Sequence, residues 1–331
     1  MRAIKFDTNR EATVVEIERP EPRPGQVVVR VTSTGVCGSD LSALSGHHLF
    51  RKPPLISGHE AGGIIDAVGE GVDGFDIGDR VVIDPQKPCG ECDFCERGLY
   101  HLCPQKVMLG VAEWDGSFAD FVEVPAYTLI PAPDGVADEH LALAEPIAVA
   151  AHAVRQLAEK SYQTALVLGG GTIGSLITRV LSDNGVVVTV SEPREFLHPK
   201  LKDLGASTVA VPGEIEPESK FDVVFIVASI AQLVQTALDH LKPGGSIVQV
   251  AVFNEEVPIH IGKLQVAEQS FHGTAMYQKE DFARALELLA KYADLPDLLI
   301  SKITSLEEGA PLITGMAKKG PGEILKLILV P

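Results

Sequence analysis

Four of the five cysteines in this 331-residue chain lie within one stretch, PCGECDFCERGLYHLCP, at residues 88–104. The spacing is C-x2-C-x2-C-x7-C, and the thiols belong to Cys89, Cys92, Cys95 and Cys103. Four thiolates complete the closed tetrahedral shell of a structural zinc ion. The stretch therefore predicts a structural zinc lobe in which Gly90 and Gly98 supply tight turns and His101 is a bystander.

Two other uses of clustered cysteines compete with zinc. An iron–sulfur cluster also takes four cysteines, but its usual spacings differ from this one. Disulfides belong to oxidising compartments, and the N-terminal residues contain no apolar stretch of signal-peptide length. We therefore expect a reducing, cytoplasmic location and a metal rather than a disulfide framework.

A second chemical motif is the glycine-rich segment TALVLGGGTIGSL, with Gly169, Gly171 and Gly174 at G-x-G-x-x-G spacing. It follows an apolar run and opens a helical pattern, which is the context of a dinucleotide-binding turn. The glycines allow the turn, the approach of a pyrophosphate and close packing of helix on strand. Ile173 lies in the same turn and is included among the predicted coenzyme contacts.

An acidic residue, Glu192, ends the next apolar run in VTVSEP. A carboxylate there can accept hydrogen bonds from the adenosine ribose and would repel a 2'-phosphate, which favours NAD over NADP. Arg194 and His198 lie nearby in the sequence, and a basic group could accommodate that phosphate instead.

The elements that position these motifs differ along the chain. Residues 1–146 contain short alternating runs typical of strands separated by turns, whereas residues 147–274 alternate apolar strands with helical stretches. After residue 275 we expect one helix and a closing strand, EILKLILV. The pattern predicts an α/β chain in which residues 147–274 form a doubly wound parallel sheet.

Composition excludes two classes of partner. The formal net charge is −17, and no Lys/Arg-rich run occurs, which argues against nucleic acid and anionic membranes. The longest apolar runs are too short and too interrupted to span a bilayer.

Cys37 in GVCGSDL, His59 and Glu60 in ISGHEAGGIIDAVGEGV, the four-cysteine stretch and the glycine turn follow one another in this order. In these motifs and their spacing the chain resembles the zinc-dependent medium-chain dehydrogenase/reductase family from end to end. Glu145 in AEPIAVA resembles the polyol, butanediol and threonine dehydrogenase branch. The resemblance implies a mostly-β, GroES-like catalytic domain made of residues 1–146 and 275–331, with a Rossmann coenzyme domain, residues 147–274, inserted between its two parts.

The resemblance also implies a second, catalytic zinc between the domains, so that two zinc ions bind per chain. Cys37 and His59 would be direct ligands, and either Glu60 or Glu145 would complete the shell, directly or through water. Glu60 could instead be a carboxylate that orients the ligands. The substrate alcohol would occupy the open position of this metal.

Further roles follow from the same resemblance. Ser39 matches the hydroxyl that relays the substrate proton, although it could simply cap a helix. Relatives often place a histidine where this chain has Ser42, so we consider His47 or His48 as the next relay group, with His48 and Phe50 alternatively shaping the cleft mouth. Trp114 and Phe118 would line the substrate pocket, although Trp114 could equally have a plain core or surface packing role. Val250 and Thr274 would contact the nicotinamide through their backbones.

The sequence thus predicts reversible, NAD-linked oxidation of a secondary alcohol to a ketone in a polyol or cyclitol-like substrate. Threonine 3-dehydrogenase and vicinal-diol dehydrogenase activities are the alternatives that the branch motifs leave open. A nucleotide-binding protein without catalysis is disfavoured because Cys37, His59, Glu60 and Glu145 are all present. By analogy with the family, we expect a homodimer or homotetramer.

Overall fold

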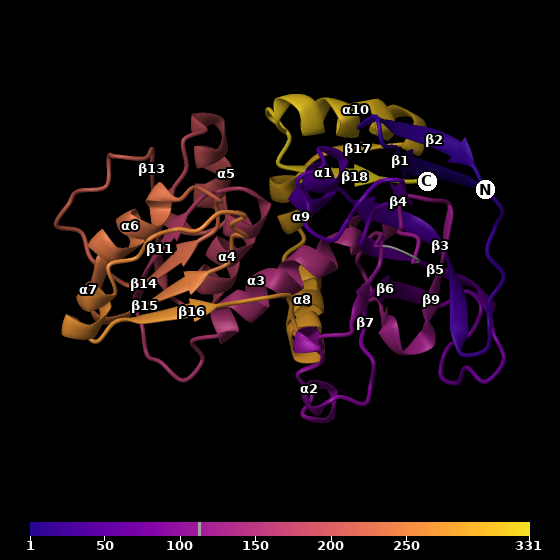
Figure 1. Ribbon diagram of the computed structural model, residues 1–331, viewed down its shortest axis with the longest axis horizontal. Coiled ribbons are helices and arrows are strands. Elements are labelled where there is room, and N and C mark those ends of the chain that lie inside the picture. The colour runs from indigo at the N-terminus through magenta and orange to yellow at the C-terminus, as the bar shows by residue number, and fades with distance from the viewer. Residues whose placement is uncertain (112–113) are drawn as a thin grey trace. The chain divides into compact units, whose positions relative to one another are not determined.

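The computed structural model describes residues 1–111 and 114–331, which divide into two compact units (Figure 1). The first contains Met1–Glu145 and Phe282–Pro331, and the second contains Pro146–Asp281. Residues 275–281, assigned to the catalytic domain from the sequence, belong here to the second unit. Arg155, at the end of helix α3 (Ala144–Arg155), holds them by donating hydrogen bonds to Gln278 and Asp281.

The second unit is built on a six-stranded parallel sheet with the order β13-β12-β11-β14-β15-β16. The strands are β11 (Thr164–Leu168), β12 (Val187–Ser191), β13 (Ala206–Ala210), β14 (Phe221–Ile226), β15 (Leu241–Gln249) and β16 (Ser270–Gly273). The chain reverses direction across the sheet between β11 and β14, and ligands of open α/β sheets bind at such a point. This confirms the predicted doubly wound sheet.

Helices α4 (Thr172–Asp183), α5 (His198–Asp203), α6 (Gln232–Asp239) and α7 (Ile261–Val266) lie between successive strands of this sheet in the sequence, and α3 precedes its first strand, β11. The central strands are apolar on both faces, as expected for a covered parallel sheet. Leu166, Leu168, Val224 and Ile226 pack in one buried cluster with Val234 of α6.

The first unit contains three sheets. One is β2 (Ala12–Glu16), β1 (Arg2–Phe6) and β4 (Leu55–Ile56), in that order. The largest runs β10 (Leu129–Pro131), β6 (Arg80–Ile83), β5 (Glu60–Val68), β3 (Gln26–Gly35), β18 (Lys326–Leu329) and β17 (Ile300–Thr304), with β9 (Phe121–Pro125) also pairing with β3. The third is the pair β7 (Gln86–Lys87) and β8 (Val107–Met108). The C-terminal strand β18 therefore lies beside β3, which leads to Cys37.

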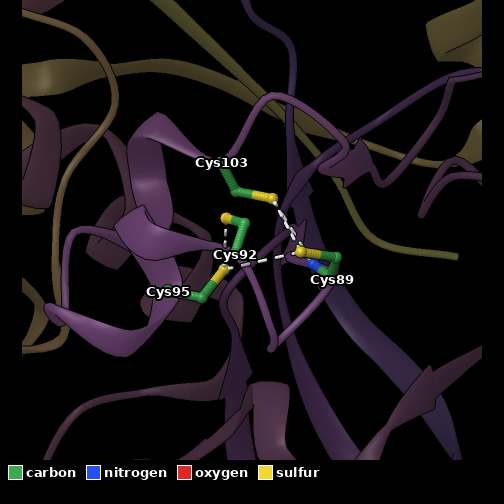
Figure 2. Close-up of side chains that lie close together, drawn as sticks. All are labelled: Cys89, Cys92, Cys95 and Cys103. Carbon is green, nitrogen blue, oxygen red and sulfur yellow. Dashed lines mark hydrogen bonds between the residues drawn. The ribbon is translucent and has the colours of Figure 1, made fainter.

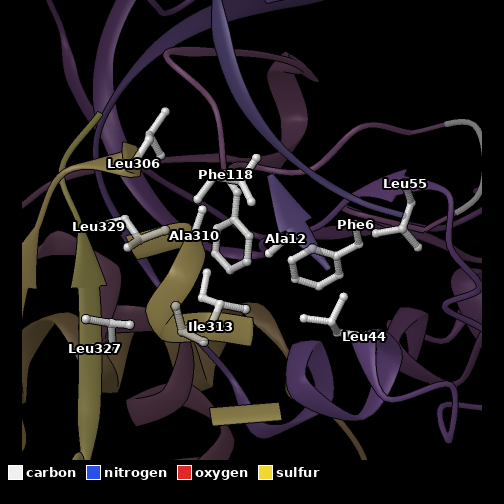
Figure 3. Close-up of a cluster of buried hydrophobic side chains, with 12 residues drawn as sticks. Phe6, Ala12, Leu44, Leu55, Phe118, Leu306, Ala310, Ile313, Leu327 and Leu329 are labelled. Carbon is white, nitrogen blue, oxygen red and sulfur yellow. The ribbon is translucent and has the colours of Figure 1, made fainter. Parts of the chain in front are cut away.

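The expectation of one helix after residue 275 is wrong. The stretch forms α8 (Lys279–Lys291), α9 (Leu295–Leu299) and α10 (Leu306–Lys319), and β17 precedes α10. Gly309 and Pro311 lower the intrinsic helix propensity of α10, but tertiary packing overrides it. Leu306, Ala310 and Ile313 of α10 lie in the buried cluster around Phe6 and Phe118 (Figure 3).

Gly309 shows why this helix needs a glycine. A Cβ at this position would lie 2.3 Å from Cδ2 of Leu329 on β18, so a larger residue would force the Leu329 side chain to move. In the described part of the chain, no helix has the length and apolar character needed to cross a membrane.

Candidate metal centres and coenzyme site

The four clustered cysteines converge in space (Figure 2). Cys92 precedes and Cys95 lies within the short helix α2 (Asp93–Glu96), while Cys103 follows the 3-10 turn Tyr100–Leu102. Gly90 and Gly98 have φ angles of 82° and 75°, which confirms the predicted turns at positions that favour glycine.

The sulfur separations fit a single metal ion. Sγ–Sγ distances are 3.5 Å for Cys92–Cys95, 3.6 Å for Cys103–Cys89 and 3.9 Å for Cys89–Cys95. Zn–S bonds of about 2.3 Å in a tetrahedron place sulfurs about 3.8 Å apart. All four thiols are free, so no disulfide competes for them. His101 does not belong to this cluster.

The Cys103 thiol is suited to metal binding. Burial raises its pKa, but the backbone N–H groups of Cys89 and Gln105 outweigh burial and lower the pKa to about 7. The thiolate is the form that binds metal.

A second cluster joins Cys37, His59 and Glu60, whose candidate ligand atoms all lie within 4.8 Å of one another. Cys37 stands between β3 and helix α1 (Gly38–Leu44), and Glu60 begins β5. Strands β3 and β5 pair so that Gly35 faces Glu60, which brings the two segments together. A Cβ on Gly35 would lie 2.0 Å from Glu60 Oε2, so this glycine makes room for the carboxylate.

Asp40 braces both halves of this cluster and is fully buried. Its Oδ2 accepts a 2.9 Å hydrogen bond from the backbone N–H of Cys37, which caps α1. Its Oδ1 accepts from Arg51 Nη1 at 2.8 Å and Ser57 Oγ at 2.6 Å, and lies 3.4 Å from His59 Nδ1. Burial raises the pKa of Asp40, but His59 and Arg51 outweigh it, so the carboxyl stays ionised.

The imidazole of His59 is oriented by these neighbours. Its Nδ1 lies 2.8 Å from Arg51 Nη1, which leaves Nε2 as the nitrogen for a metal. Burial and Arg51 lower the pKa of His59, but Asp40 and Cys37 outweigh them and raise it to about 10. If Nε2 binds a metal, the single proton of the neutral imidazole must be on Nδ1. The acceptor within reach of that N–H group is the carboxylate of Asp40. Such a carboxylate fixes the tautomer of a metal-binding histidine.

A buried lysine, Lys326, is hydrogen-bonded to one candidate acidic ligand, Glu60, and interacts electrostatically with the other, Glu145. Lys326 Nζ donates to both oxygens of Glu60, at 2.9 and 2.6 Å, and to the carbonyl of Val36 at 3.2 Å. Burial lowers the pKa of Lys326, but Glu60, Cys37 and Glu145 outweigh it and raise the pKa. Glu145 is buried in the same unit as the cluster but does not belong to it.

The glycine turn has the geometry of a nucleotide-binding loop. Gly169 has a φ of 111° and donates its N–H to the carbonyl of Ser191, and Gly171 precedes the first turn of α4. A Cβ on Gly174 would lie 1.8 Å from the Gly169 carbonyl, so a side chain there would push the helix away from the turn. Ile173 lies half-buried in that first turn.

The predicted nicotinamide contacts lie at the same edge of the sheet. Val250 follows β15 and Thr274 follows β16, and the last residues of these strands, Gln249 and Gly273, pair with each other. Parallel strands present their carboxyl ends together, so both backbones lie on the edge that carries the glycine turn.

Glu192 is almost fully buried, with 2% exposure, and is tied to the glycine turn. Its Oε2 accepts from the backbone N–H of Gly170 at 2.8 Å and its Oε1 from that of Arg194 at 2.9 Å. The Arg194 guanidinium donates to both oxygens, from Nε at 2.7 Å and Nη2 at 3.2 Å. Burial raises the pKa of Glu192, but these donors outweigh it and lower the pKa.

Comparison with known proteins decides the family. Residues 23–134 match the family model of the alcohol dehydrogenase GroES-like domain, and residues 172–291 match that of the zinc-binding dehydrogenases. The chain is 34% identical over 299 residues to 2-dehydro-3-deoxy-L-galactonate 5-dehydrogenase of Pseudoalteromonas atlantica, covering 88% of this chain and 87% of that protein. The chain belongs to the zinc-dependent medium-chain dehydrogenase/reductase family.

Two solved structures of dehydrogenases share the whole fold. One, from Sinorhizobium meliloti 1021, is assigned as a zinc-binding dehydrogenase and is bound to NADP; it has a TM-score of 0.92 and 28% identity and covers 100% and 99% of the two chains. The other is an alcohol dehydrogenase from Escherichia coli complexed with NADH, with a TM-score of 0.91, 28% identity and the same coverage. These matches confirm the predicted GroES-like and Rossmann domains.

The residues predicted for the proton relay and the cleft mouth, Ser39, His48 and Phe50, follow Cys37 closely in the sequence. The Ser39 hydroxyl is buried and has no hydrogen-bond partner among the described residues. His48 Nδ1 accepts the backbone N–H groups of Phe50 and Arg51, at 3.2 and 3.0 Å, which ties this ring to its own turn. The side chain of Phe50 is 74% exposed. Its place at the mouth of the cleft stays a prediction.

The two aromatic residues predicted for the substrate pocket of this dehydrogenase make core contacts, and their place in a pocket stays a prediction. Trp114 is buried in a cluster with β3, β5 and β6, and its Nε1 donates to the Glu123 carbonyl at 2.9 Å. Phe118 is fully buried against Phe6, and its Cδ1 would lie 2.5 Å from a Cβ on Gly58 (Figure 3). Phe118 thus supports the segment that carries His59. Residues 112–113 of this loop lie outside the described part.

We expect Lys326→Met to destabilise the zinc-free dehydrogenase by about 3–5 kcal/mol, the usual cost of leaving one member of a buried ion pair unpaired. Zinc should recover part of this loss, because the ion supplies a positive charge beside Glu60. Calorimetry with and without zinc measures both effects. Lys242→Met, which removes a partly exposed pair with Asp222, is the control, and its effect should not depend on zinc. Equal losses with and without zinc in Lys326→Met would contradict this prediction.

Proposed function

We propose that this chain is a dehydrogenase that uses zinc and a nicotinamide coenzyme to oxidise a secondary alcohol reversibly to a ketone, in a polyol or cyclitol-like substrate. The observation that carries the proposal is the cluster of Cys37, His59 and Glu60 braced by Asp40. Three protein groups leave one tetrahedral position open, as in catalytic zinc sites. The sugar-acid dehydrogenase relative supports a polyhydroxylated substrate.

Each residue of the cluster has a distinct task. Cys37 and His59 would hold the metal, and Glu60 or Glu145 would complete its shell. When bound, zinc would supply the Lewis acidity that makes an alkoxide accessible near neutral pH. Asp40 orients His59 and the backbone of Cys37, and the carboxylate of Glu60 is held by Lys326. The Ser39 hydroxyl, which has no hydrogen-bond partner among the described residues, would relay the substrate proton outward, accepting it while it passes its own hydroxyl proton on towards solvent.

Replacing Ser39 tests this relay. Ser39→Ala should lower turnover by about 10²–10⁴-fold, the usual contribution of general acid–base catalysis. Zinc content and coenzyme affinity should be unchanged, because the hydroxyl makes no hydrogen bond to the Cys37 cluster among the described residues. Turnover is measured across the pH range, and zinc by elemental analysis. Unchanged turnover at every pH would remove Ser39 from the mechanism.

The coenzyme would bind at the glycine turn and the first turn of α4, whose N–H groups can receive the pyrophosphate. The open space at Gly171 fits a pyrophosphate. Apart from its neighbours in the sequence, the nearest atom to a Cβ built on Gly171 is Arg194 Nη2, at 3.8 Å, and no other atom of the described chain lies within 4 Å. Structural relatives carry NADP in one case and NADH in another. The sequence favours NAD through Glu192, and this preference depends on whether that carboxylate is free to bind ribose.

The proposal extends to location and assembly. A reducing, cytoplasmic compartment suits five free thiols. A homodimer or homotetramer is proposed by analogy with the family, and light scattering of the purified protein tests it.

A substrate screen is the direct test of the proposed function. The purified protein should reduce a nicotinamide coenzyme with a polyol or cyclitol, and activity should disappear on chelation and return with zinc. Vicinal diols and L-threonine form the other arms of the screen, since the sequence leaves both open. No turnover with any secondary alcohol, in protein that has its full zinc, would favour a nucleotide-binding protein without catalysis.

A further inference from the structure

An arginine is buried beside the candidate metal cluster. Arg51 is 4% exposed, and the hydrogen-bond partners recorded for its guanidinium in the described part of the chain are Asp40 and His59. A buried cation is costly unless it is paired. Both partners belong to the metal cluster or brace it, so the role of Arg51 lies at this site.

The Arg51 guanidinium stands between a carboxylate and an imidazole. Its Nη1 lies 2.8 Å from Asp40 Oδ1 and 2.8 Å from His59 Nδ1. The carboxylate oxygen and the imidazole nitrogen are 3.4 Å apart, beyond the usual N–H···O distance of about 2.7–3.2 Å. Asp40 Oδ1 also accepts from Ser57 Oγ, so two donors already occupy its two lone pairs. Arg51 thus keeps Asp40 from a short hydrogen bond with His59.

A metal ion on His59 requires a different arrangement. With the metal on Nε2, Nδ1 carries the proton and is a donor. Two N–H groups cannot bond to each other, so Arg51 Nη1 must withdraw from Nδ1, and Asp40 must accept the imidazole proton in its place. The positive charge of Arg51 also opposes a nearby dication, and burial reduces the screening of that repulsion. Both effects weaken metal binding.

We propose that Arg51 is a positioning residue that lowers the affinity of the Cys37–His59 site for zinc, by competing with His59 for the carboxylate of Asp40. The inference rests on the proposed function only in that this cluster binds zinc. A carboxylate bonded to a metal-binding histidine raises the basicity of that ligand, and sharing the carboxylate with Arg51 reduces this gain. A ligand that donates less charge leaves the ion a stronger Lewis acid. Arg51 therefore makes the ion less tightly held and more reactive.

Zinc affinity tests this proposal without any substrate. Arg51→Met removes the charge and the donors from a side chain of similar length, and it should tighten zinc binding by about 10–100-fold, the range over which outer partners of metal ligands act. Competition with a chromophoric chelator measures the affinity, with Cys37→Ser protein as the baseline for zinc in the four-cysteine lobe. Cobalt(II) gives a second readout, because its thiolate absorption band should appear in lobe-loaded zinc protein only when Cys37 is present.

Further variants separate this role from a structural one. Asp40→Asn should weaken zinc binding by about 10–100-fold. In the Asp40→Asn background, Arg51→Met should give a smaller gain than it does alone, because Arg51 acts through Asp40. Arg51→Lys should restore most of the unaltered affinity, since it keeps the charge. Arg51→Gln keeps an N–H donor for Asp40, so it guards against misfolding of the Met variant, and it should also tighten zinc binding.

Lys52→Met is the matched control, because Lys52 is the next cation in the sequence and its side chain is exposed. It should leave zinc affinity unchanged. With full zinc, Arg51→Met should turn over more slowly at an unchanged KM for coenzyme. Tighter zinc together with slower turnover is a combination that simple loss of structure does not produce.

The proposal is overturned if Arg51→Met and Arg51→Gln bind zinc no more tightly than the unaltered protein. It is also overturned if the gain is equally large in the Asp40→Asn background, or if tighter zinc binding comes with faster turnover. In each of these cases the proposed function stands, because zinc still binds at Cys37. If the folded, unaltered protein takes up no cobalt at Cys37, the inference and the proposed function both fail.

Discussion

Cys37→Ser should nearly abolish turnover in a protein that still folds. Metal Lewis acidity contributes several kcal/mol to the transition state, which corresponds to roughly 10³-fold or more in rate. A hydroxyl is a poor replacement for a thiolate ligand, so the cluster should lose its zinc. The fold should tolerate the change because Cys37 is the N-cap of α1, and serine is a preferred N-cap residue.

Three measurements decide the Cys37→Ser experiment. Elemental analysis should find about two zinc ions per chain in the unaltered protein, one for a closed and one for an open site, and about one in the variant. Thermal unfolding should shift little, and coenzyme binding should be unchanged. Full activity in Cys37→Ser, or one zinc per chain in fully active unaltered protein, would refute the assignment of a catalytic metal to Cys37 and His59.

The central strands of the coenzyme unit could be predicted because their signal is local. β11 and β14 are buried on both faces along most of their length, so each appears in the sequence as a largely apolar run. The edge strand β13 (Ala206–Ala210) was not predicted, because only Ala206 is buried in the sequence ASTVA. An edge strand with one covered end leaves no apolar run or clean alternation.

The C-terminal part of the chain could not be predicted in the same way. Gly309 and Pro311 argue against a helix by local propensity, and α10 forms because its apolar face packs on β1 and β18. These contacts join residues from opposite ends of the chain, and a single sequence carries no signal for them. The domain boundary depends on a similar long-range contact, between Arg155 and Asp281.

The candidate site shows the same division. Residue types and motif order indicate the thiols, His59 and Glu60, and the structure brings these together. Asp40 lies in the same G-x-C-G-x-D motif, and the ability of aspartate at N3 to cap a helix was a usable signal. The sequence gives no signal for the role of Lys326. This residue lies 266 positions from Glu60 and contacts that carboxylate only because β18 pairs with β3. Arg194 was visible in the sequence, but its hold on Glu192 required coordinates.

The zinc lobe gives the largest expected effect on stability. Within residues 88–104, only His101 and Cys103 are buried, so the lobe has almost no hydrophobic core. Helix α2 has four residues and none of them is buried, and isolated helices this short are unstable in water. Tyr100 Oη donates to Asp84 Oδ2 at 2.8 Å, which adds one tie to the rest of the unit. Metal binding must therefore supply most of the free energy that orders the lobe.

Cys103→Ser should accordingly unfold the lobe while sparing the chemistry of any enzyme that remains folded. A loss of about 3 kcal/mol would lower Tm by roughly 4 °C in a chain of this size. Hydrogen exchange across residues 88–104 should become fast, and zinc should fall by about one ion per chain. Because Cys37→Ser makes the same chemical change at the other cluster, the two variants are matched, and they should lose opposite properties. An unchanged Tm and slow exchange in Cys103→Ser would show that protein contacts, and not a four-thiolate metal, hold the lobe together.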